Sequence, residues 1–107
     1  MGIPYNKEMI NKMTNPETKE YNKLSITQKE ELQSWIKGRF THRKTINTNH
    51  TSYGYKHVFE NDRHGFYISN EQFKGAMLEA GYYPRDKSSK NWSFYVKFFA
   101  LANDDYC

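Results

Sequence analysis

The residues with the clearest chemical potential lie within residues 32–59, a stretch that contains no aspartate or glutamate. Basic side chains alternate there with neutral hydrogen-bonding side chains, a mixture that proteins use to contact nucleic-acid phosphates. Because charge segregated in this way creates a local field, we predict that the stretch binds an anionic surface. An ordinary solvated loop is the alternative. The candidate binding residues of this stretch are Arg39, Arg43, Lys44, Asn47, Asn49, Tyr53 and Lys56.

A second basic group follows at residues 85–90. Arg85, Lys87 and Lys90 surround a single acid, Asp86, in a segment that also holds two serines. Segments of this kind form hairpin tips, and such tips can touch the minor groove or the backbone of DNA. A solvent-exposed tip with no binding role is an equally good interpretation. Lys74, on a predicted helix, completes the set of candidate binding residues.

The histidines are the obvious candidates for metal ligands, but their pattern does not support a metal site. His42, His50, His57 and His64 match no recognised zinc spacing, and the single thiol, Cys107, is the last residue. The sequence also contains no Gly-rich phosphate loop and no nucleophile–base motif. We therefore expect no cofactor, no metal and no enzymatic activity, with a small nuclease as a minor alternative.

Size and composition suit one small domain with an aromatic core. Only 36% of the 107 residues are hydrophobic, but 17% are aromatic, and each buried ring removes a large area from water. The net charge is +4, and outside residues 32–59 the chain is close to neutral. One cysteine rules out an internal disulfide, and no apolar run reaches the length of a membrane span. We expect a cytoplasmic protein of a bacterial host cell, with no membrane association.

Three helices are predicted from capping signals and apolar spacing. The first is capped by Thr27, with Glu30 three residues later, and ends near Gly38. The second begins after Thr51 or Ser52 and ends at residues 60–65. The third has the best signals, a Ser69–Gln72 capping box and a terminal Gly81. The apolar stripe of this third helix consists of Phe73, Ala76, Met77 and Ala80.

The remaining segments are predicted from alternation and turn residues. Residues 41–52 have no periodicity and are expected to form a loop, whereas residues 65–69 form a short strand. Residues 82–84 and 92–99 are predicted to pair as a hairpin, because apolar and polar residues alternate in the second segment. The predicted core consists of Leu32, Trp35, Ile36, Val58, Phe59, Phe66, Phe73, Met77, Trp92, Phe94 and Val96.

The stretch "GFYISNEQFKGAMLEAGYYPRDKSSKNWSFYVKF", residues 65–98, resembles the winged-helix modules of phage and plasmid replication proteins. A glycine–aromatic strand leads into a capped helix, a terminal glycine, a basic loop and an aromatic strand. The resemblance implies a small α+β, winged helix-turn-helix-like domain of three helices and a C-terminal β-hairpin. We assign this domain to residues 25–107 and a polar N-terminal arm or loose helix to residues 1–24.

The third predicted helix does not suit base reading. In a helix-turn-helix protein it would enter the major groove. Its predicted outward face, however, carries two glutamates, one lysine and an apolar residue, and the glutamates repel phosphate. This composition weakens the prediction of sequence-specific DNA binding. The predicted outward residues are Glu71, Lys74, Gly75, Leu78 and Glu79.

The segments "INTNHTSYGYKHVFE" and "YISNEQFKGAMLEAGY" resemble small accessory proteins of phages and conjugative elements of low-GC Gram-positive bacteria. Some of those proteins are anti-CRISPRs, which inhibit RNA-guided nucleases. The resemblance implies a non-enzymatic binding protein whose partner is a CRISPR nuclease of the host. The alternative is a winged-helix transcriptional regulator or replication accessory protein that binds DNA or RNA, expected to act as a homodimer because one small module buries little surface.

Overall fold

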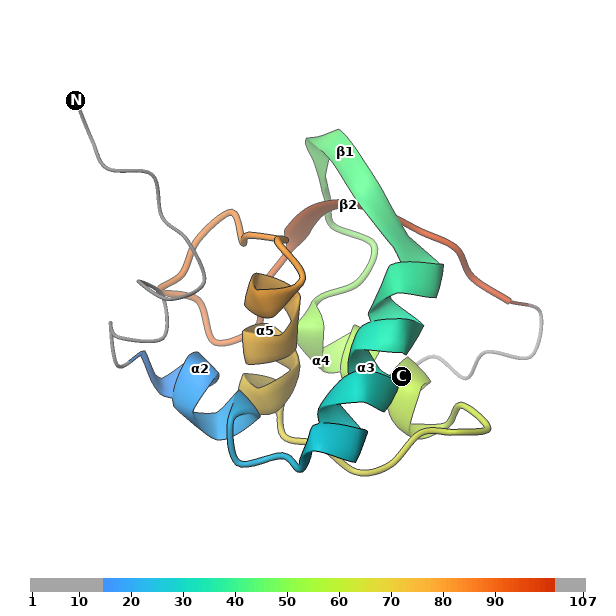
Figure 1. The fold of residues 1–107 in the computed structure, drawn as a ribbon. Helices are drawn as coiled ribbons and strands as arrows, with labels where there is room; N and C mark the ends of the chain where they lie inside the picture. Colours follow the sequence, from blue (N-terminus) through green and yellow to red (C-terminus); the bar gives the residue numbers. More distant parts are fainter. Residues whose placement is uncertain (1–14, 102–107) are drawn as a thin grey trace.

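The fold combines four helices with a two-stranded antiparallel sheet in the part of the chain that the structure, a computed structural model, describes: residues 15–101. This result confirms the predicted α+β class. The described residues hold the three helices expected after residue 24 and a further one, α2, in the segment predicted to be a polar arm or loose helix. Figure 1 shows the sheet at one end of the molecule, with α5 at the centre of the helices. In chain order the elements are α2 (Pro16–Tyr21), α3 (Ile26–Arg39), β1 (Phe40–Asn47), α4 (Ser52–Glu60), α5 (Asn70–Glu79) and β2 (Phe94–Phe98).

Helix α3 begins earlier than predicted, so Thr27 is not its cap. Ser25 caps the helix: its hydroxyl accepts a hydrogen bond from the Gln28 amide at 3.1 Å, and Gln28 Oε1 accepts one from the Ser25 amide at 2.9 Å. Leu24, just before the cap, is buried, whereas Ser25 and the first residues of the helix are exposed. Gly38 lies inside the helix and does not end it. The sequence contains two overlapping capping signals, Ser25–Gln28 and Thr27–Glu30. The structure uses Ser25–Gln28, so the helix begins earlier than predicted and directly follows the buried Leu24.

The two caps can be told apart by mutation. Ser25→Ala should lower the free energy of unfolding by about 1 kcal/mol, because it leaves an amide of the first turn without its acceptor. Thr27→Ala should change stability by less than about 0.5 kcal/mol, since Thr27 is exposed and lies within the helix. Urea denaturation of both variants measures the difference. A larger loss for Thr27→Ala would contradict the observed start of the helix.

The predicted loop at residues 41–52 is wrong over most of its length, because residues 40–47 form strand β1. β1 pairs with β2 in antiparallel register, with Phe40 opposite Phe98 and Thr41 opposite Lys97, and an irregularity follows His42. Only the two ends of β1 are buried, so it lacks the alternation that identifies a strand in sequence. The strand is defined by its distant partner rather than by its own pattern.

The other two strand predictions also change. Residues 65–69 do not form a strand; they run from the end of α4 to the cap of α5. The predicted hairpin is reduced to a single bridge between Pro84 and Phe94. Proline has no amide hydrogen to continue a ladder, and β2 forms its longer pairing with β1 instead.

Helices α4 and α5 begin where predicted, but the predicted outward face of α5 is largely buried. Ser69 and Gln72 form the capping box, and Gly81 follows the helix with φ 93°, in the left-handed region that favours glycine. Lys74, Gly75 and Leu78 are buried because α2 packs against this side of α5 (Figure 1). Helix α5 is therefore covered on two sides.

The core is aromatic, as predicted. All the predicted core residues are buried except Trp35 and Phe66, which are partly buried and pack against the core. Tyr21 and Leu24, from the predicted arm, also belong to the core, whereas residues 1–14 lie outside the described residues. Further core members are Phe40, Tyr55, Ile68, Ala76, Leu78 and Tyr82. No helix within residues 15–101 is long and apolar enough to cross a membrane.

Candidate functional site

Arg39, the first of the predicted binding residues, is buried and holds two parts of the fold together. Its Nε donates a hydrogen bond to the Phe99 carbonyl at 2.7 Å, and its Nη1 lies 3.7 Å from Asp62 Oδ2. The guanidinium also lies over the rings of Trp35 and Phe98, at 5.2 and 4.9 Å. These contacts join the end of α3 to the segment after β2, and they keep Arg39 away from the surface.

Three more of the predicted binding residues are also engaged inside the protein. Lys56 forms an ion pair with Glu60 at 3.0 Å within α4. Lys74 donates to the Lys90 carbonyl at 2.8 Å, and its Nζ lies 3.6 Å from Glu17 Oε2 of α2. The buried Asn47 amide donates to the Val96 carbonyl at 3.1 Å, which joins β1 to β2. A count of basic residues in the sequence cannot show which lysines are paired inside the protein, because it does not show which carboxylates lie next to them.

The other predicted cations are exposed, and they fall on two segments of the chain. Arg43 and Lys44 lie on β1, and Arg43 donates to the carbonyls of Thr45 and Ile46 while remaining exposed. The second segment is the loop between α5 and β2, which carries Arg85, Lys87 and Lys90. Asn49, after β1, and Tyr53, on α4, are also exposed.

The sheet brings two acid-free parts of the chain together. Residues 32–59 contain β1, and residues 87–101, which also lack acids, contain β2. On β2 the exposed Tyr95 and Lys97 alternate with the buried Phe94 and Val96, and the Lys97 ammonium lies 5.3 Å from the exposed Phe99 ring. Sequence reasoning missed Lys97, although the same search for acid-free stretches would have found it. We call this surface the basic sheet, defined by Arg43, Lys44, Tyr95, Lys97 and Phe99.

The single acid of the 85–90 loop is occupied within the loop itself. Asp86 accepts hydrogen bonds from the Ser88 hydroxyl at 2.6 Å and the Ser88 amide at 2.9 Å, with Ser89 at 3.3 Å. The hydrogen bond from the Ser88 hydroxyl is the main reason that the pKa of Asp86 is lowered, since it stabilises the ionised carboxylate. The basic side chains of the loop therefore project from a structured turn beside a cleft of about 350 Å³.

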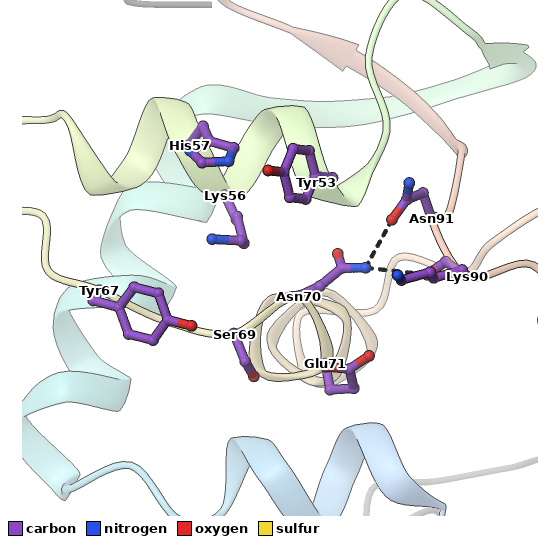
Figure 2. A pocket seen from close by; sticks show the side chains of 9 residues that line it. All are labelled: Tyr53, Lys56, His57, Tyr67, Ser69, Asn70, Glu71, Lys90 and Asn91. Atoms are coloured by element: carbon purple, nitrogen blue, oxygen red, sulfur yellow. Dashed lines mark hydrogen bonds between the residues drawn. The ribbon is translucent and has the colours of Figure 1, made fainter. Parts of the chain in front are cut away.

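A larger open cleft, of about 670 Å³, lies between α4 and the start of α5 (Figure 2). We call it the α4–α5 cleft; Tyr53, Lys56 and His57 line it from α4, and Tyr67, Asn70 and Asn91 line it from the facing segments. The Asn70 amide nitrogen donates to Asn91 Oδ1 at 2.9 Å and to the Lys90 carbonyl at 3.1 Å. Tyr53, Lys56 and Lys90, all predicted binding residues, thus meet in one place.

The histidines do not converge. His42 stacks on Tyr82 with 4.5 Å between ring centroids, and His50 lies edge-on to Tyr55 at 5.5 Å. Within residues 15–101, no three His, Cys, Asp or Glu side chains are grouped so that they could hold a metal ion.

Comparison with protein-family models, with curated proteins and with solved structures finds no match to this chain.

Proposed function

We propose that this protein is a non-enzymatic nucleic-acid-binding protein that grips the phosphate backbone through the basic sheet. The observation that carries the proposal is the pairing of two acid-free stretches, which places exposed Arg43, Lys44 and Lys97 on the two strands of one sheet. Arg43 and Lys44 lie in the irregular part of β1 that follows His42. Lysine and arginine on such a surface displace the counterions of a nucleic acid, and this release drives binding that does not depend on sequence. The basic loop at residues 85–90 extends the surface.

A winged-helix arrangement is part of the proposal. It is supported by the position of β1 between α3 and α4, by its pairing with β2, and by the bridge from Pro84 to Phe94. In this arrangement α5 has the place of the recognition helix, and the loop at residues 85–90 has the place of the wing. Because α2 covers the outer side of α5, the protein binds the backbone rather than reading bases in the major groove.

Charge reversal on the basic sheet tests the proposal. The variant with Arg43→Glu, Lys44→Glu and Lys97→Glu should bind random-sequence nucleic acid at least about tenfold more weakly, and its affinity should depend less steeply on salt concentration. The three side chains are exposed, so the variant should remain folded. Fluorescence anisotropy over a series of salt concentrations measures both effects.

A matched control changes the net charge equally at exposed cations outside the basic sheet. Lys19, Lys23 and Arg63 are exposed and lie on α2, in the turn after α2 and in the turn after α4. Reversal of these three charges should weaken binding much less. Equal losses in the two variants would show that only the overall charge matters, and the proposed surface would then be wrong.

The second candidate function is inhibition of a nucleic-acid-handling enzyme, in particular an RNA-guided nuclease, by a protein of a phage or mobile element. The observation that favours it is the pair of exposed rings, Tyr95 and Phe99, beside the cations of the basic sheet. Aromatic residues next to arginine are typical of protein interfaces. Such an inhibitor should co-purify with its target from a bacterial lysate even after nuclease treatment, whereas a nucleic-acid binder should not.

A further inference from the structure

The α4–α5 cleft is lined by two largely exposed tyrosine side chains, Tyr53 and Tyr67. The Tyr67 side chain is 78% exposed and Tyr53 is 48% exposed, although most aromatic residues of the described chain pack in or against the core. The Lys56 ammonium lies between the two rings, 5.1 Å from the Tyr67 centroid and 5.6 Å from the Tyr53 centroid (Figure 2). Lys56 covers one side of each ring, but Tyr67 stays largely exposed, so the rest of its ring is open to a ligand.

One end of the cleft holds a polar group in a fixed orientation. Both hydrogen bonds from the Asn70 nitrogen, to Asn91 and to the Lys90 carbonyl, determine which way the amide points. Its oxygen then faces the side of the cleft that carries Lys56 and Tyr53 (Figure 2). That oxygen has no hydrogen-bond partner among residues 15–101, and neither does Nε2 of His57. Shielded polar atoms without partners are uncommon in proteins, so this end of the cleft calls for a hydrogen-bonding ligand.

The charges around the cleft favour a neutral planar ligand over a simple anion. Lys56, Lys90 and Glu71 line the cleft, and Glu60, outside the lining, offsets the charge of Lys56 at 3.0 Å. A phosphate group inside the cleft would meet these carboxylates. A nucleobase would not, because it is uncharged, has a face that stacks on tyrosine, and has an edge that can donate to an amide oxygen.

The cleft also adjoins the basic loop at residues 85–90, because Lys90 lines it. Asn91 lines both this cleft and the smaller one beside Arg85 and Asp86. The loop before β2 is joined to the start of α4, since the Ser52 amide donates to the Trp92 carbonyl at 2.8 Å and the Trp92 amide donates to the Ser52 hydroxyl at 3.0 Å. The end of the basic loop is thus held beside the cleft.

From these observations we infer that the α4–α5 cleft binds one unpaired nucleobase, which stacks on Tyr67 and hydrogen-bonds to the amide of Asn70. The inference rests on the proposed function, because the basic sheet and the basic loop supply the backbone contacts of the same nucleic acid. It adds a preference for single strands, which backbone contacts alone do not explain. Base–aromatic stacking tolerates every base, so the preference is for unpaired nucleotides rather than for a sequence.

The test compares oligonucleotides with and without bases. The full-length protein should bind a single strand of about a dozen nucleotides roughly tenfold more tightly than an abasic strand of equal length. In Tyr67→Ala this preference should disappear, while binding to the abasic strand and to duplex stays unchanged. Tyr83→Ala is the matched control, because Tyr83 is 47% exposed and lies outside the cleft. Tyr67→Phe, which keeps the ring, should retain the preference.

The outcomes separate the base site from the proposed function. If Tyr67→Ala keeps the preference for the strand with bases, the base site is wrong, and the backbone surface stands as long as charge reversal on the basic sheet still weakens binding. If the unchanged protein binds no oligonucleotide, both proposals fail. If Tyr67→Ala instead abolishes capture of a protein from nuclease-treated lysate while oligonucleotide binding is unaffected, the cleft receives a protein side chain and the inference is overturned.

Discussion

Replacement of Gly75 by alanine should lower the free energy of unfolding by about 3 kcal/mol, because it places a methyl group inside the contact between α2 and α5. A Cβ atom at this position would lie 2.3 Å from the Glu17 carbonyl oxygen and 2.6 Å from Tyr21 Cβ. The nearest atom belongs to the backbone, so α2 as a whole must move. That movement would pull Tyr21 out of the core and disturb the hydrogen bond of 3.1 Å from Gln33 to the Tyr21 hydroxyl.

The control for this variant is Gly38→Ala, in the last turns of α3. No heavy atom of residues 15–101 outside the local helix lies within 4 Å of a Cβ built at Gly38, and the residue is exposed. Alanine there should raise stability by about 0.5–1 kcal/mol, the difference in helix propensity between the two residues. Urea denaturation of both variants gives the comparison. If Gly75→Ala is as stable as Gly38→Ala, then α2 does not pack on α5 as described.

Glu60→Ala should lower the free energy of unfolding by about 3 kcal/mol, because it leaves the buried ammonium of Lys56 without a counter-charge. Glu60 Oε2 accepts hydrogen bonds from Lys56 Nζ at 3.0 Å and from the Ile68 amide at 3.1 Å. The side chains of Lys56 and Glu60 are only 7% and 14% exposed, so water replaces these bonds poorly. The variant loses the attachment of the 65–69 segment to α4 as well as the ion pair.

An exposed ion pair of similar length provides the contrast. Lys23 and Glu20 are 2.8 Å apart, but their side chains are 66% and 37% exposed. Glu20→Ala should therefore change stability by less than about 1 kcal/mol, since solvent screens the pair. Thermal unfolding of both variants at low and high salt measures the difference. A loss in Glu60→Ala no greater than in Glu20→Ala would show that the Lys56–Glu60 pair is not buried.

The sequence predicts most of the residue types at the candidate site, but it does not predict how those residues are arranged in space. The acid-free stretch of residues 32–59 correctly contained Arg43 and Lys44, which are exposed on β1. It also contained Arg39 and Lys56, whose partners Asp62 and Glu60 lie just beyond its end in the sequence. A charge pattern records which residues are present, but it does not show which of them fold back onto a neighbouring carboxylate.

The chain's own local pattern determined the capping box of α5 and the apolar stripes of α4 and α5, because these depend on residues within one or two turns of each other. The Ser69–Gln72 box and the buried Phe73 and Met77 follow from such short-range spacing. Only the tertiary structure decided that residues 40–47 form a strand and that Gly75 and Leu78 face inward. Both outcomes depend on partners distant in sequence: the pairing of β1 with β2 satisfies backbone groups that have no local partner, and the packing of α2 turns an apparently exposed side of α5 into core.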